Sequence, residues 1–490
     1  MKINIDPQGE LFKWGPIDGK LIYPDFFNVA FVRFQKAGFK SWPDVLWLAS
    51  KEKMLCVLDN NNLYECGRKN FIKFILVDNQ FKKFYQSWRN SLKKFLTFKK
   101  EISPEKLKRL TIKQLVDFYQ QWVKYYLGFW TVGELPEVAN WGGEIILKEK
   151  LKKLVPADNF IYIFERLSAP VNLSFYQKAE FDLLKLKEFS KRPKLFKQKI
   201  DIYQKKYFWI LNSYHHTRVL DQNYFKKELA TYSFKKAQAK IKELGSHNKR
   251  IRQEKDLIIR NYHLGAGIRK IVERLTFCIW WQDLRKYYIF LANHQIDLFL
   301  KEFSHRYKLD FESLHYYNVS EIFELIEVGK RLGAKEIKRR RLNLVVHYSE
   351  KFNQLNYISG IRAKKIIALY TTLKVDRGTK EFKGLVVSQG KVVRGRVRIL
   401  TSTANFSEMK KGEILVASMT SPDYITAIKK AAAIITDEGG MTCHAAIVSR
   451  ELRIPCIVGT KIATKVLKNG DIVNINTNQG IISLVKRKIK

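Results

Sequence analysis

The alternation of hydrophobic and polar positions divides the chain into three parts. Residues 1–95 mix aromatic-rich segments with turns, and the short branched runs 54–58 and 71–77 predict strands of a small α+β region. Residues 96–370 repeat apolar positions at three- and four-residue steps, which predicts a helical domain. Beyond them, residues 384–486 show short β-like runs. We therefore expect a multidomain protein, mainly α-helical in its N-terminal and central regions and α/β at its C-terminal end.

The helical region also carries signals for where helices begin. Thr111 and Gln114 have the spacing of a capping box, in which each side chain bonds the backbone N–H of the other residue. Segments 223–244 and 250–303 contain few Gly or Pro residues and predict long helices. Residues 371–383 are polar and without a pattern, and we interpret them as a hinge linker.

The C-terminal part has the pattern of a compact α/β domain with its own core. Two helical candidates, 422–430 and 444–452, lie between its apolar runs. The predicted strands are 384–387, 392–400, 414–417, 433–435, 454–458, 472–475 and 480–485.

Composition narrows the class of protein. No apolar run reaches the roughly 18–20 residues that cross a bilayer, and the first residues offer no signal-peptide core, so we expect a cytoplasmic protein. The five cysteines are scattered and lack Cys-x-x-Cys spacing, which indicates neither a zinc site nor a disulfide framework.

The formal net charge of +43 raises the question of a polyanionic partner. The basic excess is spread evenly along the chain, which favours a general compositional bias over a nucleic-acid groove. The densest run, 338–341, is expected on a solvated helix face. Nucleic acid is therefore not the expected partner, although small anionic substrates are favoured.

The segment from Thr436 to Arg450 carries the candidate chemistry. It follows an apolar strand, turns through Gly439 and Gly440, and enters a helix that Thr442 is placed to cap. His444 then lies in the first helical turn, where free N–H groups and the helix dipole favour an anion. A neutral imidazole there can attack phosphorus, and Arg450 can assist if it faces the same way.

The same segment, continued to Thr460, resembles the phosphohistidine signature of the PEP-utilising enzymes, a family that includes phosphoenolpyruvate synthase, pyruvate phosphate dikinase and rifampicin phosphotransferase. The resemblance covers about 382–486. It implies a swivelling β/β/α domain, phosphorylation of His444 on its ε2 nitrogen, and a regulatory threonine at Thr442 beside it. The stretches 384–395, 412–417, 419–423 and 469–473 resemble the family's domain in the same order.

The helical region resembles, more weakly, the acceptor-binding helical domain of rifampicin-phosphotransferase-like proteins, in stretches 133–137, 203–210 and 280–286. The adjacent histidines His215 and His216 lack the i, i+4 spacing of helix-borne metal ligands, so we predict no metal site. The candidate residues of an acceptor pocket are Glu134, Glu137, His215, His216 and Arg285.

These features predict a kinase-type transferase that is incomplete alone. Neither a convincing ATP-grasp phosphate loop nor the PEP/pyruvate-binding barrel of the complete enzymes is evident. We expect a separate ATP-grasp protein to bind Mg²⁺ and ATP (or PEP) as the phosphoryl donor. His444 would then carry the phosphoryl group to a small molecule held by the helical domain. Two alternatives remain: a non-enzymatic regulator switched by phosphorylation, and a polyanion-binding protein that keeps the domain as a relic.

Overall fold

The structure is a computed structural model that describes residues 3–352, 354–372, 378–401, 403–420, 424–440 and 443–487. The strands are β1 (Leu11–Asp18), β2 (Asp44–Ser50), β3 (Lys53–Asp59), β4 (Asn343–Ser349), β5 (Gln354–Ser359), β6 (Glu381–Lys383), β7 (Leu385–Ser388), β8 (Val393–Ile399), β9 (Ile414–Ala417), β10 (Ala433–Thr436), β11 (Cys456–Val458), β12 (Ile472–Asn476) and β13 (Ile481–Lys486).

Helices make up most of the first 370 residues, and shorter ones occur in the C-terminal region. In chain order they are α1 (Ile22–Lys36), α2 (Asn60–Asn70), η1 (Phe71–Ile75), α3 (Asp78–Lys99), α4 (Pro104–Arg109), α5 (Ile112–Leu151), α6 (Ala157–Ser168), α7 (Phe175–Lys185), η2 (Leu186–Phe189), α8 (Pro193–Tyr207), α9 (Gln222–Ala230), α10 (Phe234–Asn261), α11 (Ala266–Tyr307), α12 (Phe311–Leu314), α13 (Val319–Val328), α14 (Ala334–Leu342), α15 (Gly360–Thr371), η3 (Thr403–Glu408), α16 (Ile425–Ile428), α17 (His444–Leu452) and α18 (Ala463–Val466).

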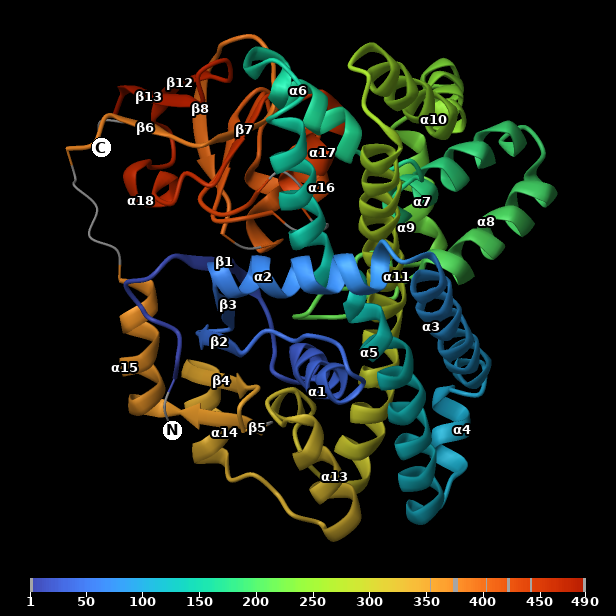
Figure 1. Cartoon of the computed structure of the whole chain (residues 1–490). Coiled ribbons are helices and arrows are strands. Elements are labelled where there is room, and N and C mark those ends of the chain that lie inside the picture. The colour runs from blue at the N-terminus through green and yellow to red at the C-terminus, as the bar shows by residue number, and fades with distance from the viewer. Residues whose placement is uncertain are drawn as a thin grey trace.

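A five-stranded antiparallel sheet joins the two ends of the first 370 residues. Its order is β1-β3-β2-β4-β5, so residues 343–359 pair with strands from the start of the chain. One face packs on α1 and the other on α15, where Val345 and Ala363 share a small core. The predicted α+β region therefore also includes β4 and β5, which lie within the residues that the sequence assigned to the helical domain (Figure 1).

The helical part is organised around two long helices, α5 and α11, which pack along each other. The capping box of Thr111 and Gln114 is confirmed at the start of α5. Helix α2 crosses α5 where Gly67 meets Gly142, and a Cβ on Gly142 would lie only 2.0 Å from the backbone nitrogen of Arg68. Only glycine allows this close crossing, which fixes α5 against the sheet.

One expectation for this region is wrong. Residues 71–77 were expected as a strand, but the π-helical turn η1 occupies residues 71–75 and α3 begins at Asp78, because Phe71, Phe74 and Ile75 follow a helical spacing that buries all three. The long helical segments are also interrupted. Ser233 is the N-cap of α10 and Gly265 that of α11, so one helix boundary falls inside each of the segments 223–244 and 250–303 that were predicted to be helical.

The C-terminal region forms a mixed eight-stranded sheet in the order β6-β13-β12-β8-β9-β10-β11-β7. All seven predicted strands and the helix at 444–452 are confirmed, while α16 is shorter than the predicted 422–430. Strand β6 lies within the predicted linker and pairs with β13. Of that linker, residues 373–377 lie outside the described part of the chain.

The C-terminal region lies against the rest of the molecule, beside α6 and β1 (Figure 1). Apolar side chains of α6, such as Phe164, and of α17, such as Ala446, belong to one continuous core. At the periphery, Lys429 pairs with Glu180 at 3.1 Å. No helix in the described ranges is long and apolar enough to cross a membrane.

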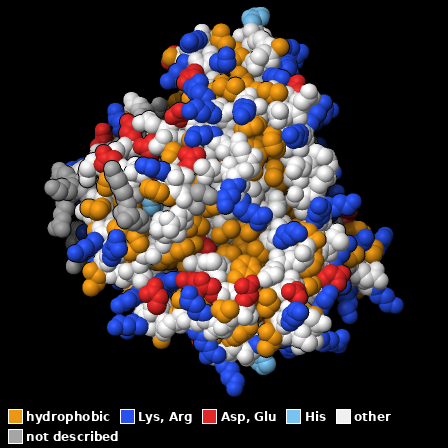
Figure 2. All heavy atoms as spheres, turned by 60° about the horizontal axis from the view of Figure 1, so that its bottom comes forward, with side chains coloured by type: hydrophobic (Ala, Val, Ile, Leu, Met, Phe, Trp, Pro, Cys, Tyr) orange, Lys and Arg blue, Asp and Glu red, His pale blue; other side chains and the backbone are white. Residues whose placement is uncertain are grey.

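Basic side chains are dispersed over the molecular face shown in Figure 2, with acidic and apolar groups between them. The run 338–341 lies on α14, as expected, but only part of it is solvated. Arg340 is buried and forms a two-pronged ion pair with Glu321, at 2.6 and 2.7 Å. One positive charge of this basic run, that of Arg340, therefore stabilises the fold instead of facing a partner.

Candidate functional site

His444 is the first residue of α17, directly after the turn that follows β10. The turn passes through Gly439 at φ +125°, where a Cβ would meet Sγ of Cys443 at 2.8 Å. Cys443 occupies the N-cap position, and its sulfur accepts from the backbone N–H of Ala446 at 3.4 Å. The cap was expected from Thr442, which lies outside the described residues.

Thr420 orients the histidine ring. Its Oγ1 lies 2.8 Å from Nδ1 of His444, and Thr420 itself is buried. When Nδ1 carries the ring proton and donates to Thr420, the lone pair of Nε2 is left to act as a nucleophile. This geometry agrees with the nitrogen that the family resemblance implies for phosphorylation.

The surroundings of His444 keep its ring uncharged. Burial and, to a smaller extent, the positive charge of Lys286 together lower its pKa to about 3. Lys286 belongs to α11, far from His444 in sequence. A neutral imidazole is the nucleophilic form, and the nearby cation suits a transferred phosphoryl group.

Arg450, near the C-terminal end of α17, contacts the neighbouring strand β7. Its Nε donates to the backbone oxygen of Val387 at 2.8 Å, and Glu165 of α6 is the largest favourable charge acting on it. Burial raises the pKa of Glu165 to about 7, against the opposing effect of Arg450. The expected phosphoryl contact of Arg450 stays a prediction, since the printed bond of its side chain links α17 to β7.

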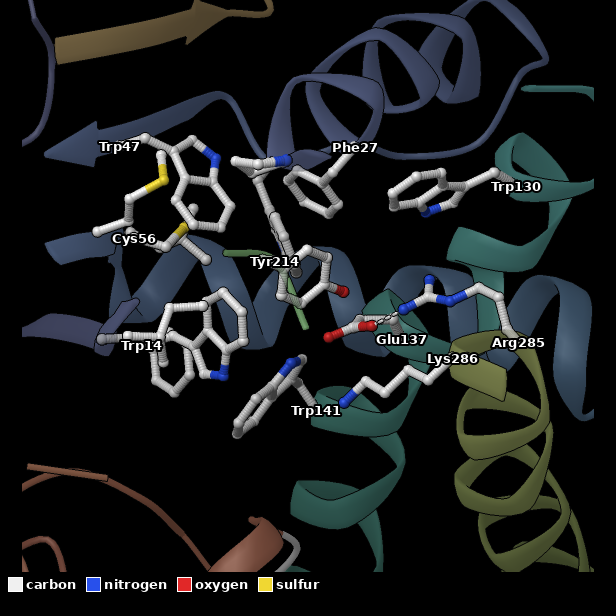
Figure 3. A pocket seen from close by; sticks show the side chains of 16 residues that line it. Trp14, Phe27, Trp47, Cys56, Trp130, Glu137, Trp141, Tyr214, Arg285 and Lys286 are labelled. Atoms are coloured by element: carbon white, nitrogen blue, oxygen red, sulfur yellow. Dashed lines mark hydrogen bonds and ion pairs between the residues drawn. The ribbon is translucent and has the colours of Figure 1, made fainter. Parts of the chain in front are cut away.

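A pocket opens beside Lys286, with about 740 Å³ of space that no protein atom fills, part of it open to solvent. It lies between the five-stranded sheet, α1, α5 and α11 (Figure 3). The orange ribbon of the C-terminal region runs past the end where Trp141 and Lys286 lie. The lining residues are Phe12, Trp14, Ile17, Pro24, Phe27, Trp42, Trp47, Met54, Cys56, Leu58, Trp130, Glu137, Trp141, Tyr214, Arg285 and Lys286.

Three of the predicted acceptor residues meet at one wall of this pocket. Arg285 pairs with Glu134 at 2.8 Å and with Glu137, and its Nη1 also donates to the backbone oxygen of Gly133 at 2.9 Å. Trp130 donates its indole N–H to Glu134. Glu137 and Arg285 line the cavity, whereas Glu134 is fully buried behind them.

The other two predicted acceptor residues, His215 and His216, are not among the residues that line the pocket. His215 binds Glu52 at 3.0 Å, and burial lowers the pKa of His216 to about 4. Their chain neighbour Tyr214 does line the pocket. Of these three neighbours, Tyr214 is therefore the one that lines the cavity, and the role of His215 and His216 in an acceptor pocket stays a prediction.

Sequence reasoning missed three residues that the structure brings to the site: Thr420, Lys286 and Trp141. Thr420 and Lys286 lie inside stretches already quoted for their family resemblance, so a signal was present. Trp141 directly precedes the glycine pair at 142–143, which the helix crossing requires. Their shared location depends on contacts between distant segments, which spacing along one segment does not encode.

The C-terminal geometry agrees with the comparisons to known proteins. Residues 409–480 match the family model described as PEP-utilising enzyme, mobile domain. The predicted family resemblance is thereby confirmed for this region.

Curated relatives point the same way. A probable phosphoenolpyruvate synthase of Archaeoglobus fulgidus is 49% identical over 125 residues, which are 26% of this chain and 16% of that protein. The phosphoenolpyruvate synthase of Pyrococcus furiosus is 47% identical over 134 residues, 24% of this chain and 16% of that protein. The matched segment thus spans about a sixth of each of these two relatives' length.

Within the described ranges, no three His, Cys, Asp or Glu side chains are grouped so that they could hold a metal ion. The site around His444 offers instead a nucleophile, an orienting hydroxyl and a cation, which are the groups that a phosphoryl carrier needs.

Proposed function

We propose that this chain is the carrier and acceptor component of a phosphotransferase. His444 is transiently phosphorylated on Nε2 and passes the phosphoryl group to a small molecule in the pocket between α5, α11 and the five-stranded sheet. The observation that carries the proposal is the position of Lys286, which lines the pocket and acts electrostatically on His444.

Different groups assist the attack of His444 on the donor and the stabilisation of the phosphorylated ring. With its Nδ1–H donated to Thr420, neutral His444 attacks the phosphorus of the donor through Nε2. The N-terminal turn of α17 and Lys286 then favour the phosphorylated ring, because both place positive charge beside the anion. Transfer to the acceptor regenerates the neutral imidazole.

The phosphoryl donor is assigned to another polypeptide in this proposal. A separate ATP-grasp protein would bind ATP, or PEP would serve as donor, with Mg²⁺ supplied along with the nucleotide. The C-terminal region would swivel on residues 371–383 between that partner and the pocket. The family model for a mobile domain supports such movement.

The pocket favours a transferase over the two alternatives. A purely regulatory switch needs no concave acceptor site, yet an aromatic cavity is lined by Lys286, the cation that acts on His444. The dispersed charge of the face in Figure 2 gives no support to a polyanion groove there. Steep salt dependence of nucleic-acid binding would still reveal such a role.

Phosphoryl uptake tests the proposal. Wild type, His444→Ala and the exposed control His305→Ala are incubated with [γ-³²P]ATP, [β-³²P]ATP or [³²P]PEP, with and without extract of the native host. We expect an acid-labile, base-stable label on wild type and His305→Ala only, and dependence on extract would reveal a separate donor protein. Absence of label from wild type with every donor and extract overturns the carrier role.

A further inference from the structure

The C-terminal region is docked on the rest of the chain by apolar burial and by the bonds of Lys53 and Lys429. Side chains of α17 and α6 belong to one continuous core, but apolar burial has no preferred direction and does not by itself fix a position. Hydrogen bonds and ion pairs do so, because they weaken quickly when their distance or angle changes. The two lysine contacts are therefore the groups that can define where the docked region lies.

The first contact joins the C-terminal region to α7. Lys429 directly follows α16, and its Nζ lies 3.1 Å from Oε1 of Glu180. The same carboxylate oxygen accepts the hydroxyl of Tyr232 at 2.6 Å, which holds it in place. Burial tends to raise the pKa of Glu180, but the charge of Lys429 leads the opposing influences, and the pKa is lowered on balance. Glu180 is thus a fixed anion that receives a cation of the C-terminal region.

The second contact joins the five-stranded sheet to the C-terminal region. Nζ of Lys53, on β3, donates to the backbone oxygen of Thr401, in the loop that follows β8. Lys53 is also paired with Asp18 at the end of β1. The chain neighbours of this pair, Ile17 and Met54, line the aromatic pocket. A hydrogen bond therefore connects strands of the pocket wall directly to the C-terminal region.

These two contacts flank the segment that orients His444. Thr420 lies between Thr401 and Lys429 in the sequence, and its hydroxyl bonds Nδ1 of the histidine. In Figure 1, α7 and β3 are well separated, so the C-terminal region is held at two separate points. Two such points oppose rotation of the region on its linker, whereas one alone would act as a pivot.

The docked arrangement suits delivery of the phosphoryl group better than loading. His444 is partly buried here, and Thr420 is buried. A donor on another polypeptide needs in-line access to Nε2, which the docked helical part restricts. An acceptor held within the chain needs a fixed position instead, since an error of about 1 Å can slow a reaction about 100-fold.

We propose that Lys53 and Glu180 are positioning residues that dock the C-terminal region for the delivery step. The inference rests on the proposed function and adds to it the contacts that define where His444 transfers its phosphoryl group. Loss of both contacts shifts the region toward its undocked form. Delivery then slows because fewer molecules are docked, while loading, which uses the undocked form, does not slow.

Hydrogen–deuterium exchange, followed by mass spectrometry, tests docking without any phosphoryl donor. Wild type is compared with Lys53→Met/Lys429→Glu, which removes both contacts, and with Lys51→Met/Lys430→Glu, which makes the same changes at exposed positions nearby. We expect α17 to exchange at least about threefold faster in the first double variant only. Strand β12, inside the sheet of the C-terminal region, is the internal reference and should not change. Thermal unfolding checks that each variant folds.

Single-turnover kinetics separates delivery from loading. Label is first taken up by His444 from the productive donor and is then released to the small molecules of host extract. In Lys53→Met/Lys429→Glu, release should slow by about tenfold, while uptake should be as fast as in wild type or faster. Misfolding would slow both steps. Adding Glu180→Lys to Lys429→Glu recreates the ion pair with reversed charges and should restore most of the release rate that Lys429→Glu alone loses.

The outcomes separate the docking role from the carrier role. Unchanged exchange of α17 in Lys53→Met/Lys429→Glu overturns the docking role. Release at the wild-type rate, or uptake slowed as much as release, overturns the positioning role. Absence of label from wild type overturns the carrier role and the delivery step with it. Because the exchange experiment uses no donor, it still decides whether the two contacts hold the region docked, and the two failures are distinguishable.

Discussion

The two sides that meet at His444 are built in different ways. The carrier side comes from one continuous stretch of chain, in which Thr420 follows β9 and the glycine turn joins β10 to α17. The pocket side gathers residues from β1, α1, β3, α5, the loop at Tyr214 and α11. A local motif can therefore specify the carrier, whereas the pocket exists only when distant segments pack correctly. The two sides should fail separately when each is altered.

The largest effect should come from the crossing that holds the pocket together. Gly142→Ala places a Cβ 2.0 Å from the backbone nitrogen of Arg68, so α2 and α5 must separate. We expect the free energy of unfolding to fall by about 3 kcal/mol, as measured by urea denaturation. Gly128→Ala in the same helix meets no atom within 4 Å and should be neutral or stabilising by up to about 1 kcal/mol. Equal loss in both variants would contradict this account of the crossing.

The second change acts where the two sides meet. Lys286→Glu replaces the cation near His444 with an anion that repels the phosphoryl group. Transfer from phosphorylated His444 should slow by about 100-fold, as followed by rapid-quench release of label. Lys301→Glu alters an exposed lysine on the same helix and is the matched control. Equal rates in these two variants would remove Lys286 from the mechanism.

The third change affects the carrier side alone. Thr420→Val removes the hydroxyl that bonds Nδ1 of His444. Phosphorylation of His444 should slow by about tenfold, since one such hydrogen bond contributes about 1–1.5 kcal/mol. Thr420→Ser should restore the rate. An unchanged rate in Thr420→Val would show that this hydroxyl does not orient the histidine ring.

The smallest effect concerns the charge of the histidine. Burial and Lys286 lower the pKa of His444 from 6.5 to about 3, so its ring signals should show no titration step between pH 5 and 8 in ¹⁵N NMR. The folded chain then binds fewer protons than the unfolded chain between these pKa values, and stability should decline as the pH falls through that window. Lys286→Met should raise the pKa. A step near pH 6.5 in wild type would show that the ring is solvated.

The sequence predicted the carrier side well because its signals are local. Strand runs, the glycine turn and the position of His444 depend on neighbours within a few residues. The strand expected at 71–77 was wrong because a buried helical turn and a strand share the same short apolar run. The residues of β4 and β2 that pair are about 300 positions apart in the sequence, and no local pattern predicts this pairing.

The pocket was predicted only in part for the same reason. Glu137 and Arg285 were identified and do face each other, but the histidines beside Tyr214 were chosen over the residue that lines the cavity. Aromatic side chains that fill a core and those that line a pocket look alike in sequence. Trp130 and Trp141 line the cavity, while Trp88 of α3 is buried and absent from the pocket lining, and only the packed structure separates them.

A pulse-chase experiment tests the central claim most directly. His444 is labelled by the productive donor, the donor is removed, and the small-molecule fraction of host extract is added to wild type, Trp141→Ala and the matched control Trp280→Ala, which removes a partly buried tryptophan outside the pocket lining. We predict that the label leaves wild type and Trp280→Ala as an organic phosphate, and stays on Trp141→Ala at least about ten times longer. Release from Trp141→Ala at the rate of wild type would show that the phosphoryl group does not travel through this pocket.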